Sequence, residues 1–234
     1  MKISIADIAS AFPLARVAAV LLEGGTITPQ RSARLEQIIA AREIEARRRF
    51  AGQELSQIPG VAAWRVAYRG FGIKRTSYRS SVERLVKRVL AGGALPQINS
   101  FVDLYNAVSL DHTLCLGADD LDALTGDVAF RFSRPGDTFL DMGAALGEDS
   151  DDPPKPGEVV YADEGHVLCR RWNWRQDARS VVTPQSRRVL LTVQSNGWGD
   201  VEAAADELAR LAKDELGMSA RIVIADAAGP VATL

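Results

Sequence analysis

Residues 95–106 read LPQINSFVDLYN, residues 156–163 read PGEVVYAD and residues 169–176 read CRRWNWRQ. Each run mixes apolar residues with polar groups that are costly to bury without hydrogen-bond partners. In the last run, two tryptophans and one asparagine stand among three arginines. Cations beside large indole rings indicate a surface that contacts a ligand. We therefore expect these runs to build a binding or hydrolytic site, and the runs alone leave both possibilities open.

The composition is that of an ordinary globular chain with enough apolar material for a sizeable core. Of 234 residues, 47% are hydrophobic and 25% are charged, and the net charge is −2. A chain with this charge is no polycation, so any nucleic-acid binding must depend on a local patch. The apolar run at residues 17–22 is too short to span a membrane. No signal peptide is visible at the N-terminus.

The cysteines and histidines follow no metal-binding or redox pattern. Cys115 and Cys169 form no Cys-x-x-Cys pair, and His112 and His166 are isolated in the sequence. Zinc sites require closely spaced Cys or His ligands, so we expect neither a metal nor a cofactor. We interpret the two cysteines as reduced thiols of a cytoplasmic protein.

Hydrophobic spacing predicts five helices and a larger number of strands. Ser80 with Glu83 three residues later forms a capping box, and Asn99 or Ser100 caps the next helix. Residues 148–156 are predicted to be a mobile acidic loop without a packed role. The pattern indicates an α+β fold, and we expect one unit over residues 1–234. The expected helices are 28–55, 61–71, 80–90, 98–110 and 200–216, and the expected strands are 14–22, 114–116, 128–132, 138–142, 158–162, 167–172, 189–194 and 221–225.

Basic residues accumulate between positions 65 and 88. Eight cations face one acid, Glu83, in a chain that is slightly acidic overall. This asymmetry favours a patch that faces a polyanion, such as a tRNA backbone. Two exposed helix faces that are basic by chance remain the alternative. The cations are Arg65, Arg69, Lys74, Arg75, Arg79, Arg84, Lys87 and Arg88.

The runs at 95–108, 120–128, 160–163 and 182–184 together resemble the B3/B4 domain of the bacterial phenylalanyl-tRNA synthetase β subunit. The chain resembles freestanding B3/4 proteins more closely still, because these carry the Trp-Asn-Trp-Arg run found at residues 172–175. The resemblance is best over about residues 60–195. It implies a layered α+β fold, with helices packed on mixed or antiparallel sheets and a central cleft. In the synthetase this cleft hydrolyses tyrosine wrongly attached to the phenylalanine tRNA, with bound water and the tRNA's terminal hydroxyl taking part.

The chain departs from the synthetase pattern at its editing residues. The position of the editing histidine falls on Gly117, and the run from Arg170 to Gln176 replaces a glycine-rich stretch. The specificity glutamate has no clear counterpart, although Gln176 and Asp177 are nearby. The resemblance therefore implies a pocket of different shape with a different ligand. Nothing in the chain resembles the aminoacylating or anticodon-reading parts of the synthetase.

Two groups of candidate site residues follow. Asp103, Asn106 and Glu158 are predicted catalytic residues that orient a water molecule or act as a general base. Alternation along a strand would place Arg171, Asn173 and Arg175 on one face and the two tryptophans on the other. Helix caps, strand-edge charges and packed tryptophans are the structural alternatives for these residues. The predicted substrate-binding residues are Asn99, Arg170, Arg171, Trp172, Asn173, Trp174 and Arg175.

Three functions remain open at this stage. The first is a freestanding editing hydrolase, which binds the acceptor end of an aminoacyl-tRNA and cleaves the ester bond. The second is a non-catalytic module that binds tRNA or an amino acid. The third is a hydrolase for a small amide or ester. We expect tRNA as the partner and no contact with membrane or DNA.

Overall fold

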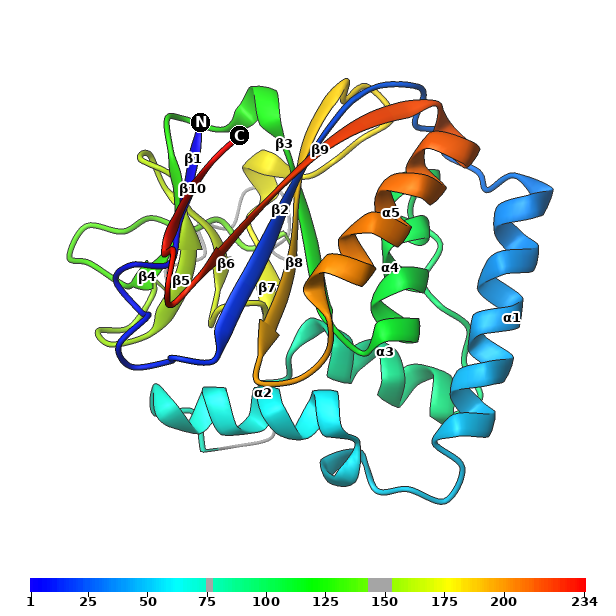
Figure 1. Cartoon of the computed structure of the whole chain (residues 1–234), viewed down its shortest axis with the longest axis horizontal. Helices are drawn as coiled ribbons and strands as arrows, with labels where there is room; N and C mark the ends of the chain where they lie inside the picture. Colours follow the sequence, from blue (N-terminus) through cyan, green and yellow to red (C-terminus); the bar gives the residue numbers. More distant parts are fainter. Residues whose placement is uncertain (75–77, 143–152) are drawn as a thin grey trace.

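The computed structural model describes residues 1–74, 78–142 and 153–234, arranged as two sheets with helices on one side (Figure 1). The first sheet has the strand order β3-β8-β2-β9 and is antiparallel throughout. At its centre, β2 (Ala15–Gly24) and β8 (Arg188–Asn196) pair over nine residues. Their apolar runs are almost wholly buried, which explains why they lie inside the sheet. The outer strands are β3 (Cys115–Asp120) and β9 (Met218–Asp226).

The second sheet has six strands in the order β10-β1-β4-β5-β6-β7. The β1–β4 pair is parallel and the other pairs are antiparallel, so the sheet is mixed, as expected. Short apolar strands separated by turns build its centre. The strands are β1 (Lys2–Ser4), β4 (Val128–Phe132), β5 (Val159–Ala162), β6 (Val167–Arg170), β7 (Arg175–Gln176) and β10 (Val231–Thr233).

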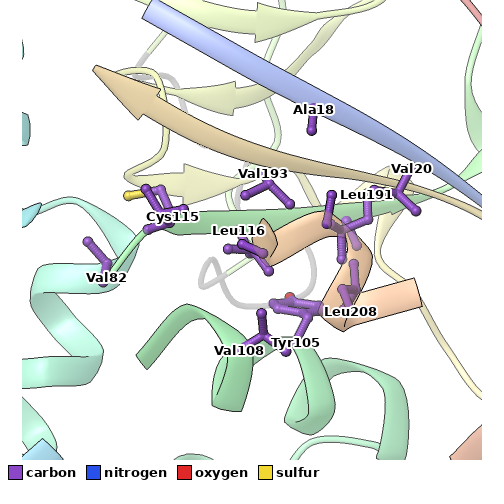
Figure 2. Packing of buried hydrophobic residues seen from close by; sticks show 14 of the residues in the cluster. Ala18, Val20, Val82, Tyr105, Val108, Cys115, Leu116, Leu191, Val193 and Leu208 are labelled. Atoms are coloured by element: carbon purple, nitrogen blue, oxygen red, sulfur yellow. The ribbon is translucent and has the colours of Figure 1, made fainter. Parts of the chain in front are cut away.

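Five α-helices lie within the described residues, and α4 and α5 lie along one face of the first sheet (Figure 1). Figure 2 shows Leu116 and Val193 of this sheet packed against Val108 of α4 and Leu208 of α5. None of the described helices is long and apolar enough to cross a membrane. The helices are α1 (Ala33–Arg49), α2 (Pro59–Gly70), α3 (Ser81–Leu90), α4 (Ser100–His112) and α5 (Val201–Leu216). Short 3₁₀ turns lie at Leu55–Gln57, Leu121–Ala123 and Ala178–Ser180.

The predicted helix starts at residues 80 and 99 are confirmed. Ser80 Oγ accepts a hydrogen bond from the amide of Glu83 at 3.4 Å. Asn99 Oδ1 accepts from the amides of Phe101 and Val102 at 3.1 and 2.9 Å, and its Nδ2 donates to Val182 at 3.1 Å. These bonds satisfy amides that would otherwise lack partners at a helix start.

The prediction of one strand over residues 167–172 is wrong. Strand β6 ends at Arg170, and residues 171–174 form a turn that leads into β7. Arg171 and Trp172 both adopt a positive φ, of 47° and 67°, which non-glycine residues rarely do. The predicted alternation of arginines and tryptophans therefore does not exist. The backbone amide of Trp172 donates to the carbonyl of Val159 in β5 at 2.7 Å, and this hydrogen bond holds residues 171–174 in a turn instead of an extended strand.

Other elements also differ from expectation. The first long helix begins at Ala33, because the hydroxyl of Ser32 caps it by accepting from Leu35. Residues 138–142 form no strand and contribute only an isolated bridge from Asp141 to Asp177. Within the predicted acidic loop, residues 148–152 lie outside the described part. Pro154 in the remainder is buried, so that end of the loop packs against the fold.

A buried ion pair holds the turn at residues 171–174 in place. Glu158 accepts hydrogen bonds from Arg170 Nε and Nη2 at 3.1 and 2.9 Å, and from the amide of Arg171 at 2.8 Å. The Glu158 side chain is 4% exposed and that of Arg170 is 1% exposed. Buried charges depend strongly on such partners. Glu158 thus joins the start of β5 to the end of β6.

Glu158→Ala is therefore expected to destabilise the fold by about 3–5 kcal/mol, because it leaves a buried guanidinium without this carboxylate. Chemical denaturation measures the change. Glu164→Ala, at an exposed glutamate of the β5–β6 turn, is the control and should change stability by less than about 0.5 kcal/mol. Equal effects of the two substitutions would contradict the importance of the ion pair.

Candidate functional site

A cavity of about 510 Å³ lies between the two sheets and the helices α3 and α4. The strand registers explain its walls. Tyr161 pairs with Cys169, and Cys169 pairs with Gln176, so these side chains form a row on one face of the six-stranded sheet. Gly117 pairs with Thr192 on the other sheet. All five residues line the cavity. Its volume falls within the range of pockets that hold small ligands.

One wall of the cavity is a chain of satisfied polar groups. Tyr68 donates to Asn173 Oδ1 at 2.9 Å, and Asn173 Nδ2 donates to Gln194 at 3.2 Å. Gln194 in turn donates to Thr192 Oγ1 at 2.9 Å. Because each buried group has a partner, this wall is rigid. It connects α2, the turn at residues 171–174 and β8.

Asp119 is the buried acid of the cavity. Its Oδ1 accepts hydrogen bonds from Ser180 at 2.7 Å and Gln176 at 3.1 Å, and the residue is 3% exposed. Burial raises the pKa of Asp119 from 3.8 to about 7, and these two hydrogen bonds lower it only in part. Asp177 and Asp163 add a smaller upward contribution to this pKa. A carboxyl group that titrates near neutral pH within a cavity is typical of functional sites.

Other polar groups of the lining have no hydrogen-bond partner among the described residues. The hydroxyl of Tyr161 is buried and unbonded. The Tyr161 ring is fixed by stacking on Phe130, with ring centroids 4.6 Å apart. The amide of Asn106 likewise has no partner in the described part of the chain and faces the same cavity. Buried polar groups normally have partners, so these groups point to a polar ligand.

Exposed arginines surround the opening of the cavity. Arg84 donates to the carbonyl of Trp174 at 3.1 Å, and Arg88 donates to that of Ala94 at 2.5 Å. Arg175 forms an ion pair with Asp141. These three arginines line the cavity and are exposed to solvent. An anionic group of a ligand would therefore be favoured at the opening.

Only some of the predicted site residues line this cavity. Asn106, Asn173, Trp174 and Arg175 do so, which brings the asparagine-bearing helix and the tryptophan run together around one hollow. Gly117 lies there too, and a Cβ atom added to it would meet no atom within 4 Å.

Asn99, Asp103 and Glu158 do not line the cavity. Asn99 caps α4, and Glu158 binds Arg170. Asp103 is fully buried, pairs with Arg31 Nε at 2.7 Å and accepts from the amide of Ile98 at 2.9 Å. A catalytic role for Asp103 or Glu158 and a ligand contact for Asn99 remain predictions from the sequence.

Arg170, Arg171 and Trp172 also lie outside the cavity lining. Trp172 is fully buried, and its ring centroid lies 5.2 Å from that of Trp64. The guanidinium of Arg171 is buried above the rings of Tyr78 and Trp174, at 3.9 and 4.3 Å. Such cation–π contacts stabilise a buried arginine.

The basic stretch divides into paired and unpaired cations. Arg65 and Arg79 both bind the buried Glu83, at 2.7 and 3.3 Å. Arg69, Lys74 and Lys87 are exposed and have no ion pair with any described residue. With Arg84 and Arg88 they form a set of exposed cations on α2, α3 and the turn between them. Arg75 lies outside the described residues.

Among the described residues that line the cavity, no cysteine or hydroxyl is paired with a histidine that could activate it as a nucleophile. Burial raises the pKa of the Cys169 thiol, and the charge of Asp119 raises it further, so the thiol stays protonated. Neither histidine is among the described residues of the lining. His112 instead binds Glu207 at 2.7 Å and lies close to Asp111. Arg42 also pairs with Glu207, which neutralises this acidic cluster.

Sequence reasoning did not name Asp119 or Tyr161 as individual site residues, and it named Gln176 only as lying near the missing specificity glutamate. The partners of Asp119 are 57 and 61 positions away, so no local spacing indicates them. The sequence signal for Asp119 is its position two residues after Gly117, because side chains two apart on a strand lie on the same face of the sheet.

Comparison with known proteins identifies one family. The model of the B3/4 domain family matches residues 63–214, more than half of the chain. No curated protein matches. Among solved structures, an N-terminal fragment of the phenylalanyl-tRNA synthetase β subunit from Pyrococcus horikoshii is similar, with 14% identity and a TM-score of 0.43. That alignment covers 94% of this chain and 50% of the fragment, so the chain spans half of the fragment's length.

Asp119→Asn should stabilise the protein at pH 8. Since folding raises the pKa of Asp119 from 3.8 to about 7, the folded state holds a proton that the unfolded state has lost between these pH values. Stability therefore falls as the pH rises through this window, by roughly 4 kcal/mol in total. Asparagine resembles the protonated acid and avoids this loss. The expected gain at pH 8 is on the order of 10 °C in Tm, and little gain is expected at pH 4.

Thermal unfolding at both pH values measures this difference. Asp206→Asn, at an exposed position of α5, is the matched control and should shift Tm little at either pH. A gain from Asp119→Asn that is the same at pH 4 and pH 8 would contradict the raised pKa.

Proposed function

Because the chain belongs to the B3/4 domain family, we propose that it binds the aminoacyl end of a tRNA and hydrolyses the ester bond there. The observation that carries this proposal is the cavity of about 510 Å³ with exposed arginines at its opening. The aminoacyl group would enter the cavity, while the phosphates of the tRNA end contact Arg84 and Arg88. Its place of action would be the cytoplasm.

The proposed chemistry requires water rather than a protein nucleophile. A water molecule attacks the carbonyl carbon, the bond from that carbon to the ribose oxygen breaks, and the ribose oxygen receives a proton. The unbonded amide of Asn106 is suited to donate a hydrogen bond to the carbonyl oxygen, where negative charge develops. A donor placed at such a developing charge accelerates ester cleavage by about 10²–10³-fold.

A non-catalytic binding module is the second candidate. It is favoured by the protonated state of Cys169 and by the absence of histidine from the described cavity lining. The opening to solvent at three arginines speaks for a tRNA end over a small amide or ester as the ligand. Turnover is therefore the measurement that separates the two leading candidates.

A panel of tRNAs charged with different amino acids tests the hydrolase. At least one ester should be cleaved faster than in buffer. Asn106→Ala should lower this rate about 10²-fold while tRNA affinity changes little. Gly117→Leu should abolish cleavage, because its side chain would enter the open space above β3.

The matched control is Gly229→Leu, because a Cβ atom there also meets no atom within 4 Å and the position lies outside the cavity. It should leave cleavage unchanged. If no aminoacyl-tRNA is cleaved, the editing hydrolase is excluded and the binding module becomes the leading candidate. Full activity of Gly117→Leu would exclude this cavity as the reaction site.

Binding of tRNA should weaken steeply with salt, since exposed cations replace counterions on the phosphates. Replacing Arg69, Lys74 and Lys87 together with glutamine should reduce the slope of log Kd against log salt by about one for each lost phosphate contact. The control replaces Arg210, Lys213 and Arg221, three exposed cations of α5 and β9. A flat salt response of the unaltered protein would argue against nucleic-acid binding.

A further inference from the structure

The buried carboxylates of this protein show one exception to charge pairing. Seven acidic residues in the described part of the chain are buried. Five of them have an arginine nitrogen within 3.6 Å, Asp163 accepts three backbone amides and lies 3.4 Å from a ring nitrogen of His166, and Asp119 has neither an arginine nor a histidine nitrogen as a partner. Buried charges are normally paired, because an isolated charge is very costly in a medium of low dielectric constant. The paired residues are Glu43, Glu83, Asp103, Glu158, Asp163 and Asp177.

The free oxygen of Asp119 belongs to the cavity. Ser180 and Gln176 both donate to Oδ1, and no described residue donates to Oδ2. Asp119 also lines the cavity, so the unbonded side of its carboxyl is available to a ligand. The groups whose charges couple with that of Asp119 are acids, phenols and a thiol, namely Asp163, Asp177, Tyr105, Tyr161 and Cys169, whereas the arginines of the lining are exposed to solvent. None of these coupled groups brings a positive charge.

The hydroxyl of Tyr161 is a second unsatisfied polar group on a residue of the cavity lining. It is buried without a partner among the described residues, and it lines the same cavity. Burial raises the pKa of Tyr161 well above 10, and Asp119 is the nearby charge that contributes most to this rise. The phenol therefore stays protonated and neutral, and its oxygen can accept a hydrogen bond.

We propose that the cavity recognises a protonated amino group of its ligand, which binds Asp119 Oδ2 and donates a further hydrogen bond to the hydroxyl of Tyr161. The ligand thus supplies the cation that the protein itself does not place beside Asp119. This inference rests on the proposed function in one respect, since the aminoacyl end of a tRNA carries such a group. The amino group comes either from the α position or from a side chain.

The proposal excludes two classes of ligand. An N-acylated amino acid has no positive charge, so it would leave Asp119 unpaired and should bind poorly. A free carboxylate in the interior would face Asp119 and would be repelled. Carboxyl groups are therefore acceptable as esters or amides inside the cavity, and anionic groups belong at the arginines of its opening.

Proton release is a further consequence. Near pH 7 the Asp119 carboxyl is partly protonated, because burial raises its pKa to about 7. A bound ammonium stabilises the ionised carboxylate and lowers that pKa. Binding at pH 7 should therefore release a fraction of a proton to solvent, and affinity should increase as the pH rises toward 7.

Isothermal titration calorimetry at pH 7 in phosphate and in Tris tests the inference, since the two buffers differ in ionisation enthalpy. The probes are phenylalaninamide, its analogue without the amino group, 3-phenylpropanamide, and 6-aminohexanamide, whose amino group stands at the far end. Phenylalaninamide or 6-aminohexanamide should bind at least ten-fold more tightly than 3-phenylpropanamide, with proton release. The preferred amine tells whether an α or a side-chain amino group is recognised.

Two variants identify the residues. Asp119→Asn should reduce the amine preference to less than two-fold and abolish proton release, and its fold is expected to be at least as stable as that of the unaltered protein. Tyr161→Phe removes a hydroxyl that has no partner among the described residues, so folding should be unaffected while amine affinity falls several-fold. Acetylated phenylalaninamide is the matched ligand control and should bind no better than 3-phenylpropanamide.

Each remaining outcome overturns the inference. These outcomes are equal affinity for amines and 3-phenylpropanamide, no saturable binding of either amine, or an amine preference that survives in Asp119→Asn. Salt-dependent tRNA binding without amine preference would retain the proposed function and end this inference. Amine preference without tRNA binding or cleavage would retain this inference and exclude the proposed function.

Discussion

The amide of Asn173 holds together the parts that surround the cavity. Its Oδ1 accepts from Tyr68 on α2, its Nδ2 donates to Gln194 on β8, and its carbonyl accepts from the amide of Ser81 on α3. One side chain and one peptide group thus connect two helices with the central strand of the first sheet. The turn at residues 171–174 positions this asparagine, and the pair of Glu158 with Arg170 fixes the turn. That turn therefore links this wall of the cavity to the second sheet.

The cavity combines a satisfied wall with an unsatisfied interior. The chain from Tyr68 to Thr192 leaves no polar group unbonded along its length, which favours rigidity. In the same cavity, the hydroxyl of Tyr161 and Asp119 Oδ2 have no partner among the described residues. An interior of this kind lowers the stability of the empty protein, and a ligand with matching groups recovers that energy. Functional sites commonly lower the stability of the folded protein in this way.

Much of the fold could be predicted from local sequence signals, and the site only in part. Capping at Ser80 and Asn99 and the apolar runs of β2 and β8 depend on neighbouring residues, so periodicity and cap chemistry indicate them. The turn at Arg171 and Trp172 could not be predicted in this way. Neither residue favours a positive φ, and the conformation comes from contacts with Glu158 and Val159. Asp119 could not be predicted as a site residue for the same reason, because its hydrogen-bond partners lie far away in the sequence.

Gly117 has a consequence for how this protein could change over time. The position sits in the middle of β3 with ordinary backbone geometry, and the space above it is open. A Cβ atom introduced there meets no neighbour within 4 Å, so a small side chain would alter the shape of the cavity without displacing packed atoms. Ligand preference at this strand is therefore separable from folding, and single substitutions at one position could give rise to variants with new selectivity on an unchanged scaffold.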